Sequence, residues 1–124
     1  MSMDEIEDIL IKSLHSNQSA SQFFSENLSN AALLNQLLDI EEESESGDAR
    51  MHGAYWISKF DESLLVQVEQ RLLTLMDCEW DSVAVHIMIA LSRIKSKAAL
   101  TKIIDQRIRP HLYWESVALH NYFS

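Results

Sequence analysis

Five histidines are the side chains of this chain best suited to metal binding or acid–base chemistry. Three of them, His52, His86 and His120, follow one another at intervals of 34 residues. If that interval is a structural repeat, equivalent positions lie about one helix-packing distance apart, roughly 8–10 Å. Zinc holds its ligand atoms about 2.0–2.1 Å from one centre, and the chain has no His-Glu-x-x-His or Cys-x-x-Cys motif. We therefore expect these histidines to pack between helices and expect no metal site.

The other reactive groups do not favour catalysis. Cys78 is the single cysteine and stands between Asp77 and Glu79, an acidic setting that disfavours the nucleophilic thiolate. Gly47 and Gly53 are the only glycines, so a Gly-rich phosphate loop is missing. We expect a protein without enzymatic activity and without a cofactor. The alternative is an enzyme or small-ligand pocket built from histidines and tryptophans, namely His86, His120, Trp80 and Trp114.

Acidic side chains are concentrated in the first part of the chain. The net charge is −9, yet residues 1–49 carry eleven acids and a single base, Lys12. Direct nucleic-acid binding needs a basic footprint, so this distribution argues against it and favours a basic protein partner. Basic residues do gather in 93–109, either as a site for phosphate or an acidic partner or, as we favour, as cations at helix C-termini.

A run of carboxylates followed by two aromatic residues is the candidate binding surface. Charge accelerates encounter with a basic partner, whereas aromatic anchors supply most of the affinity in protein interfaces. The alternative is a solvated linker followed by aromatics that only fill the core. The residues expected to bind the partner are Asp39, Glu41, Glu42, Glu43, Glu45, Asp48, Tyr55 and Trp56.

An internal repeat predicts the elements that position these residues. The phrase that begins at Trp80 and ends at His86 returns from Trp114 to His120, and a fainter copy precedes both at 48–52. Such self-similarity is typical of stacked helical repeats. Few Gly and Pro residues also favour helices. From apolar spacing and the break at Pro110 we expect helices at 3–14, from about 19, and at 31–43, 49–60, 62–77, 82–94, 97–109 and 115–123.

The chain is therefore expected to form one domain over residues 1–124, with two parts. Residues 1–47 would form a helical cap and an acidic linker, and residues 48–124 about two and a half helix–turn–helix units. The alanine-rich helix at 82–94, the Lys95-Ser96-Lys97 turn and the Leu/Ile-rich helix at 98–108 resemble HEAT-like helical repeats. That resemblance implies an all-α fold, a short α–α superhelix of HEAT-like helical hairpins with a helical N-terminal cap.

The small size, acidity and expected fold also resemble those of bacterial immunity proteins, including those of contact-dependent growth inhibition. The resemblance implies a protein that binds and neutralises a cognate toxin domain, commonly a basic nuclease. The alternative is a generic helical-repeat scaffold or adaptor without a toxin partner. A single cysteine, an acidic N-terminus and the lack of a long apolar run predict a cytoplasmic protein that contacts no membrane. The sequence leaves the oligomeric state open.

Overall fold

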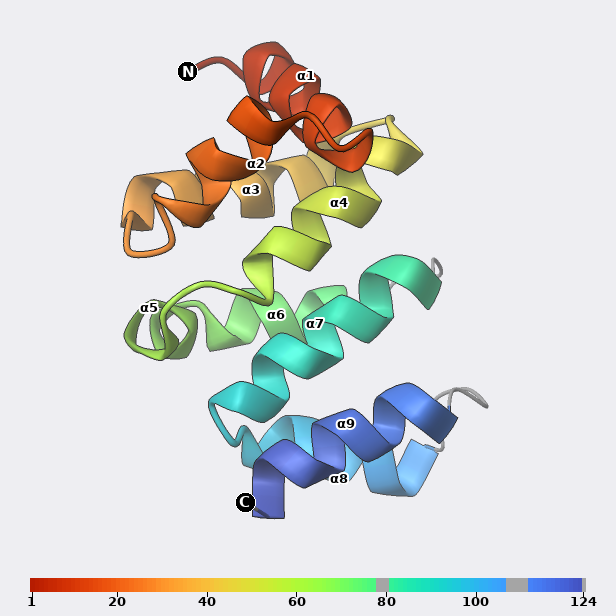
Figure 1. Cartoon of the computed structure of the whole chain (residues 1–124). Coiled ribbons are helices and arrows are strands. Elements are labelled where there is room, and N and C mark those ends of the chain that lie inside the picture. The colour runs from red at the N-terminus through yellow and green to blue at the C-terminus, as the bar shows by residue number, and fades with distance from the viewer. Residues whose placement is uncertain (78–80, 107–111, 124) are drawn as a thin grey trace.

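The computed structural model describes residues 1–77, 81–106 and 112–123, and the regular secondary structure in these ranges is helical throughout. The helices follow one another through short turns (Figure 1). Their bounds are α1 Met3–Leu14, α2 Gln18–Ser25, α3 Ala31–Glu43, α4 Gly47–Ile57, α5 Glu62–Gln67, α6 Glu69–Leu75, α7 Asp81–Arg93, α8 Lys97–Gln106 and α9 Leu112–Phe123.

Side-chain caps explain where the first four helices begin. Ser2 and Glu5 form a capping box at the start of α1, with the Ser2 hydroxyl accepting from the Glu5 backbone N–H. Asn17, Asn30 and Ser46 accept equivalent bonds at the starts of α2, α3 and α4. The predicted helices 3–14 and 31–43 are thus confirmed. The acidic linker is shorter than expected, because α4 already begins at Gly47.

The expectation of one continuous helix over 62–77 is wrong. The segment is divided into α5 and α6 at Val68, whose φ of −113° and ψ of 19° leave helical geometry. At the C-terminal end, α9 begins at Leu112, earlier than expected. Pro110 and the predicted end of the preceding helix lie outside the described residues.

The helices pack in two rows. In the first row α1, α4, α7 and α9 contact one another in succession. The second row covers one side of it: α3 packs on α1 and α4, α6 on α3 and α7, and α8 on α7. In Figure 1 the stack runs from α1 to α8 and α9, so that the two termini lie at opposite ends. The acidic N-terminal segment therefore forms one end of the molecule.

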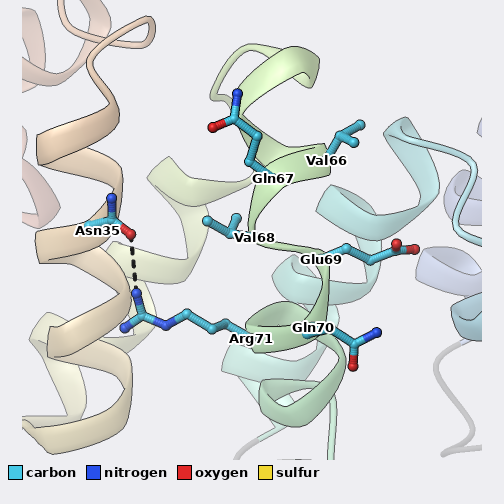
Figure 2. Close-up of a pocket in the computed structure, with 7 residues that line it drawn as sticks. All are labelled: Asn35, Val66, Gln67, Val68, Glu69, Gln70 and Arg71. Atoms are coloured by element: carbon cyan, nitrogen blue, oxygen red, sulfur yellow. Dashed lines mark hydrogen bonds between the residues drawn. The ribbon is translucent and has the colours of Figure 1, made fainter.

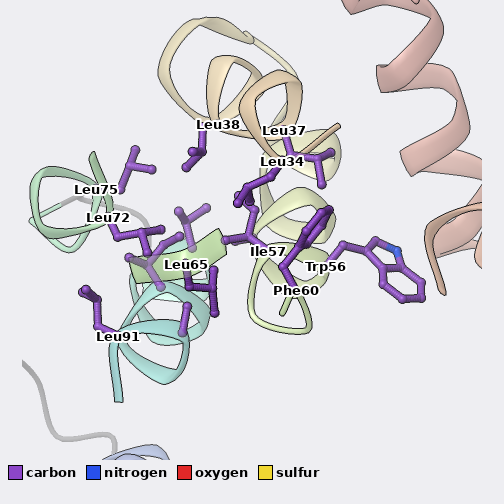
Figure 3. Packing of buried hydrophobic residues seen from close by; sticks show 14 of the residues in the cluster. Leu34, Leu37, Leu38, Trp56, Ile57, Phe60, Leu65, Leu72, Leu75 and Leu91 are labelled. Atoms are coloured by element: carbon purple, nitrogen blue, oxygen red, sulfur yellow. The ribbon is translucent and has the colours of Figure 1, made fainter. Parts of the chain in front are cut away.

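Apolar side chains between the two rows form the core. Figure 3 shows leucines of α3 and α6 meeting Ile57 at the end of α4 and Phe60 in the turn that follows it, with Leu65 and Leu91 beside them. Trp56 points away from this cluster, toward the N-terminal helices. The core thus holds α3 and α4 rigidly together, which fixes the turn between them. Within the described ranges, we find no helix with the length and apolar character needed to cross a membrane.

Candidate functional site

Carboxylates of α1, of the turn between α3 and α4 and of the first turn of α4 lie around a contact between α1 and that turn; Glu7 is half-buried and the others are exposed. Ser44, at the end of α3, donates its hydroxyl to Glu7 Oε1 of α1 at 2.6 Å. Asp4 lies one turn before Glu7 on the same side of α1. We call this surface the acidic corner, and it comprises Asp4, Glu7, Glu43, Glu45 and Asp48.

The acidic corner is not neutralised from within the part of the chain that the structure describes. None of its carboxylates lies within ion-pair distance of a described Lys, Arg or His side chain. Asp48 stands in the first turn of α4, where the helix dipole favours a negative charge. Glu43, the last residue of α3, and Glu45 flank Ser44 and are both exposed. The corner therefore presents negative charge that is not paired with any described cation.

Asp39 and Glu42, two of the expected partner-binding residues, are instead held by Arg71 of α6. Its guanidinium donates to Asp39 Oδ1 at 2.9 Å and to Glu42 Oε1 at 2.5 Å, and a further bond of 3.2 Å reaches Asn35 (Figure 2). The hydrogen bond to Glu42 is the main reason why the pKa of Arg71 is raised. We call these hydrogen bonds the Arg71 clamp. A cleft of about 340 Å³ lies beside it, lined by Asn35 and by the segment Val66–Arg71.

Glu41 is not at the surface, so its assignment to the binding site is wrong. The residue is 1% exposed, and its carboxyl lies between α3 and α4 against Gly53. Neither carboxylate oxygen has a hydrogen-bond partner among the described residues. Burial raises the pKa of Glu41 to about 9, although the charge of Arg50 and the nearby Ala54 backbone N–H, which is not in normal hydrogen-bond geometry, lower it. Glu41 is therefore protonated at neutral pH and adds no negative charge to the surface.

Trp56 is also wrongly assigned, because it is 8% exposed. Its indole stacks on Phe24 at 5.3 Å between ring centroids and donates from Nε1 to Ser13 Oγ at 3.2 Å. Tyr55 is half-buried, stacked on His52 and edge-on to His86. Both aromatics join α4 to its neighbours, so they cannot serve as the free anchors that the sequence suggested.

Two of the three histidines at equivalent repeat positions, His52 of α4 and His86 of α7, lie beside Tyr55 in the seam between these helices. The Tyr55 ring lies 5.1 Å from His52 and 5.7 Å from His86 between ring centroids. Burial lowers the pKa of both histidines, with a further contribution from His86 at His52 and from Lys59 at His86. Both imidazoles are therefore neutral at neutral pH.

Ser13, which sequence reasoning did not single out, is bonded to His52. Its Oγ lies 3.0 Å from His52 Nε2 and 3.0 Å from Ser21 Oγ, and it also accepts from Trp56. A Ser–His pair can in principle serve as nucleophile and base. Here Ser13 is buried and its bonds tie α1, α2 and α4 together, so a substrate has no access to it.

Among the described residues, no group of three or more His, Cys, Asp or Glu side chains is arranged to hold a metal ion. His120 is exposed on α9, so the expectation that it packs between helices is wrong. Cys78, Trp80 and the Trp114 side chain, for which we stated expectations from the sequence, lie outside the described part of the chain.

A groove between α1 and α2 is the second feature that sequence reasoning missed. It measures about 380 Å³, and its lining is mainly apolar: Met1, Ile9, Lys12, Asn17, Ser19, Ala20 and Phe23. Phe23 is only partly buried, whereas its neighbour Phe24 is fully buried.

Comparison of the chain with protein-family models, with curated proteins and with solved structures finds no match.

Proposed function

We propose that this chain is a protein-binding module that captures a basic protein domain, and that it acts as an immunity protein neutralising a cognate toxin. The observation that carries the proposal is the acidic corner. Its carboxylates come from α1, the α3–α4 turn and α4, and none is paired with a described cation. A basic partner that binds such a surface neutralises its charge, which is favourable. The same negative charge accelerates the partner's approach.

The fold supports this use of the surface. Helical hairpins stacked in a HEAT-like superhelix with an N-terminal cap would hold the corner on a rigid support. The successive contacts of α1, α4 and α7, and the capping box and side-chain cap at the starts of α1 and α4, agree with such a stack. A rigid support lowers the entropic cost of ordering side chains on binding. Inhibition would then arise from steric and electrostatic occlusion.

If the chain is an immunity protein, we expect the protein encoded immediately upstream to carry the cognate toxin as its C-terminal domain. The test purifies that domain with this chain as a complex. The corner variant carries Glu43→Gln, Glu45→Gln and Asp48→Asn. We expect it to bind that domain about tenfold more weakly, a loss of about 1.4 kcal/mol. Expression of the upstream domain alone should arrest growth, and co-expression of the wild-type chain should restore it.

A matched control carries the same change of charge elsewhere. Asp61→Asn, Glu62→Gln and Asp77→Asn also raise the net charge from −9 to −6, at exposed positions outside both the corner and the α1–α2 groove. We expect this variant to bind like the wild type within about threefold, because long-range charge alone is largely screened in salt. Equal weakening in both variants, or none in either, would refute the assignment of the corner.

An adaptor that assembles with itself is the second candidate function, and one observation favours it. Phe123 on α9 is 77% exposed, the largest exposure among the described large apolar residues. Sedimentation across a hundredfold concentration range would show a dimer that Phe123→Ser abolishes. A monomer throughout that range would exclude this alternative.

A further inference from the structure

The groove between α1 and α2 lies next to the proposed binding surface and lacks a covering element in the described chain. Ile9 on α1 and Phe23 on α2 form its apolar walls, and buried Ala20 forms part of its floor. The Met1 side chain is 54% exposed at its edge. The volume of the groove, about 380 Å³, is within the range of about 300–1,000 Å³ typical of ligand pockets.

In the described part of the chain, Lys12 is the one charged side chain that lines the groove. The acidic side chains Glu5, Asp8 and Glu26 lie within one helical turn of the groove's lining residues. Glu5 lies one turn before Ile9 on α1, and Glu26 follows Phe23 by nearly one turn on α2. Lys12 lines the groove, but its ammonium group is 3.0 Å from Asp8 Oδ2. The rim therefore complements an apolar group that is carried on a basic segment.

Helix geometry connects this groove to the acidic corner. At about 100° per residue, Glu7 and Ile9 lie on opposite sides of α1, and Asp4 and Asp8 lie on the solvent-facing side between them. A partner that covers α1 therefore reaches the corner on one side of the helix and the groove on the other. Tyr55 and Trp56 are packed against other side chains of this chain and cannot serve as apolar anchors for the partner. The apolar contact would then come from a side chain of the partner that enters the groove.

We propose that the α1–α2 groove receives a large apolar side chain, Leu, Phe or Trp, from a basic segment of the partner protein. This inference rests on the proposed function, because it takes the partner to be basic. The apolar side chain would bury Ile9 and Phe23, while flanking Lys or Arg residues pair with Glu5 and Glu26. Such a central apolar residue surrounded by polar contacts is the usual arrangement of a binding hot spot.

The experiment uses the full chain and a fluorescein-labelled peptide, Lys-Lys-Leu-Trp-Leu-Lys-Lys, with binding followed by anisotropy. Two further peptides separate the contributions: one replaces the central Leu-Trp-Leu by three serines, and the other replaces every Lys by Glu. We expect the first peptide to bind at least tenfold more tightly than either. Equal binding of the serine peptide would overturn the inference, because charge alone would then explain binding.

Variants at the groove provide the decisive comparison. Ser19 is exposed and lines the groove, so Ser19→Trp should fill it and weaken the Leu-Trp-Leu peptide at least tenfold. Ser25→Trp adds the same side chain on the far side of α2 and should leave binding unchanged. Ser19→Lys adds no comparable apolar bulk and should also weaken binding, through repulsion of the basic peptide. Unchanged affinity in both Ser19 variants would contradict the proposal.

The same variants distinguish failure of this inference from failure of the proposed function. If the upstream domain binds Ser19→Trp as tightly as the wild type but loses affinity for the corner variant, the groove is unused and the proposed function stands. If the peptide depends on Ser19 but the upstream domain does not bind, the groove result stands and the proposed function fails. A concentration-dependent dimer that Ser19→Trp abolishes would identify a second copy as the occupant and overturn the inference.

Discussion

Glu41 is a carboxylic acid held between helices where an apolar residue would ordinarily lie. It is 1% exposed, and its oxygens have no hydrogen-bond partner among the described residues. An ionised carboxylate in such surroundings is strongly disfavoured, so the folded protein keeps the proton. Because burial raises the pKa from 4.5 to about 9, the folded chain binds a proton that the unfolded chain releases near pH 4.5.

The first prediction concerns stability against pH. Between the unfolded and folded pKa values of Glu41, the folded state holds more protons, so the free energy of unfolding falls as pH rises. The stabilising effect is complete below about pH 4.5 and is lost progressively toward pH 9. Urea unfolding should therefore show a decrease on the order of a few kcal/mol between pH 7 and pH 9.

Glu41→Gln is the control for this prediction, because the amide is similar in shape and does not titrate in this range. Its free energy of unfolding should change little between pH 7 and pH 9. The buried histidines do not confuse the comparison, since their lowered pKa values confine their contribution to lower pH. A wild-type protein as insensitive to pH as the variant would show that Glu41 is not buried.

A second prediction follows from the glycine that faces this carboxyl. A Cβ at Gly53 would stand 2.9 Å from Glu41 Oε1. Gly53→Ala gains about 1 kcal/mol of helix propensity but crowds a buried group, which costs about 1–3 kcal/mol. We expect a net loss of about 1 kcal/mol in the wild type. In the Glu41→Ala background the same change should stabilise by about 1 kcal/mol, because the crowding is gone. An equal effect in both backgrounds, measured by thermal unfolding, would show that the two residues do not interact.

At the scale of the element, local signals predicted some helices well. The helices 3–14 and 31–43 were predictable because Ser2, Glu5 and Asn30 cap their first turns and apolar side chains recur at helical spacing. The division at Val68 was not predictable, because neither Gly nor Pro marks it and the apolar pattern continues across it. Packing of α6 on α3 and α7 decides that geometry, and a single segment carries no information about its neighbours.

The Arg71 clamp joins two elements and supplies a third prediction. Arg71 connects α6 to Asp39 and Glu42 of α3 through groups that are 33%, 52% and 39% exposed. Exposed ion pairs contribute little, so Arg71→Ala should lower the free energy of unfolding by about 1 kcal/mol or less in low salt. The loss should shrink in about 0.5 M salt, where surface charges are screened. Arg71→Lys should restore only part of it, because lysine lacks the guanidinium fork. A loss that is independent of salt would indicate packing instead of charge.

At the scale of the whole molecule, the sequence predicted where the charge lies but not which carboxylates face a partner. The excess of acids in residues 1–49 does form one end of the stack. Yet Glu41 is buried and Asp39 and Glu42 are paired with Arg71, while Asp4 and Glu7 join the corner from a distant segment. A run of acidic residues does not reveal these differences, because they depend on how α1 and α6 pack against α3.

The central claim, that the acidic corner attracts a basic protein domain, is tested most directly by association rates. Stopped-flow mixing would measure the rate constant for this chain and the upstream-encoded domain at about 0.05 M and about 0.5 M salt. The wild-type rate should fall at least tenfold over that range, since electrostatic steering is lost in salt. The corner variant with Glu43→Gln, Glu45→Gln and Asp48→Asn should associate more slowly in low salt and approach the wild-type rate in high salt. Identical rates and identical salt dependence for the two proteins would contradict the claim.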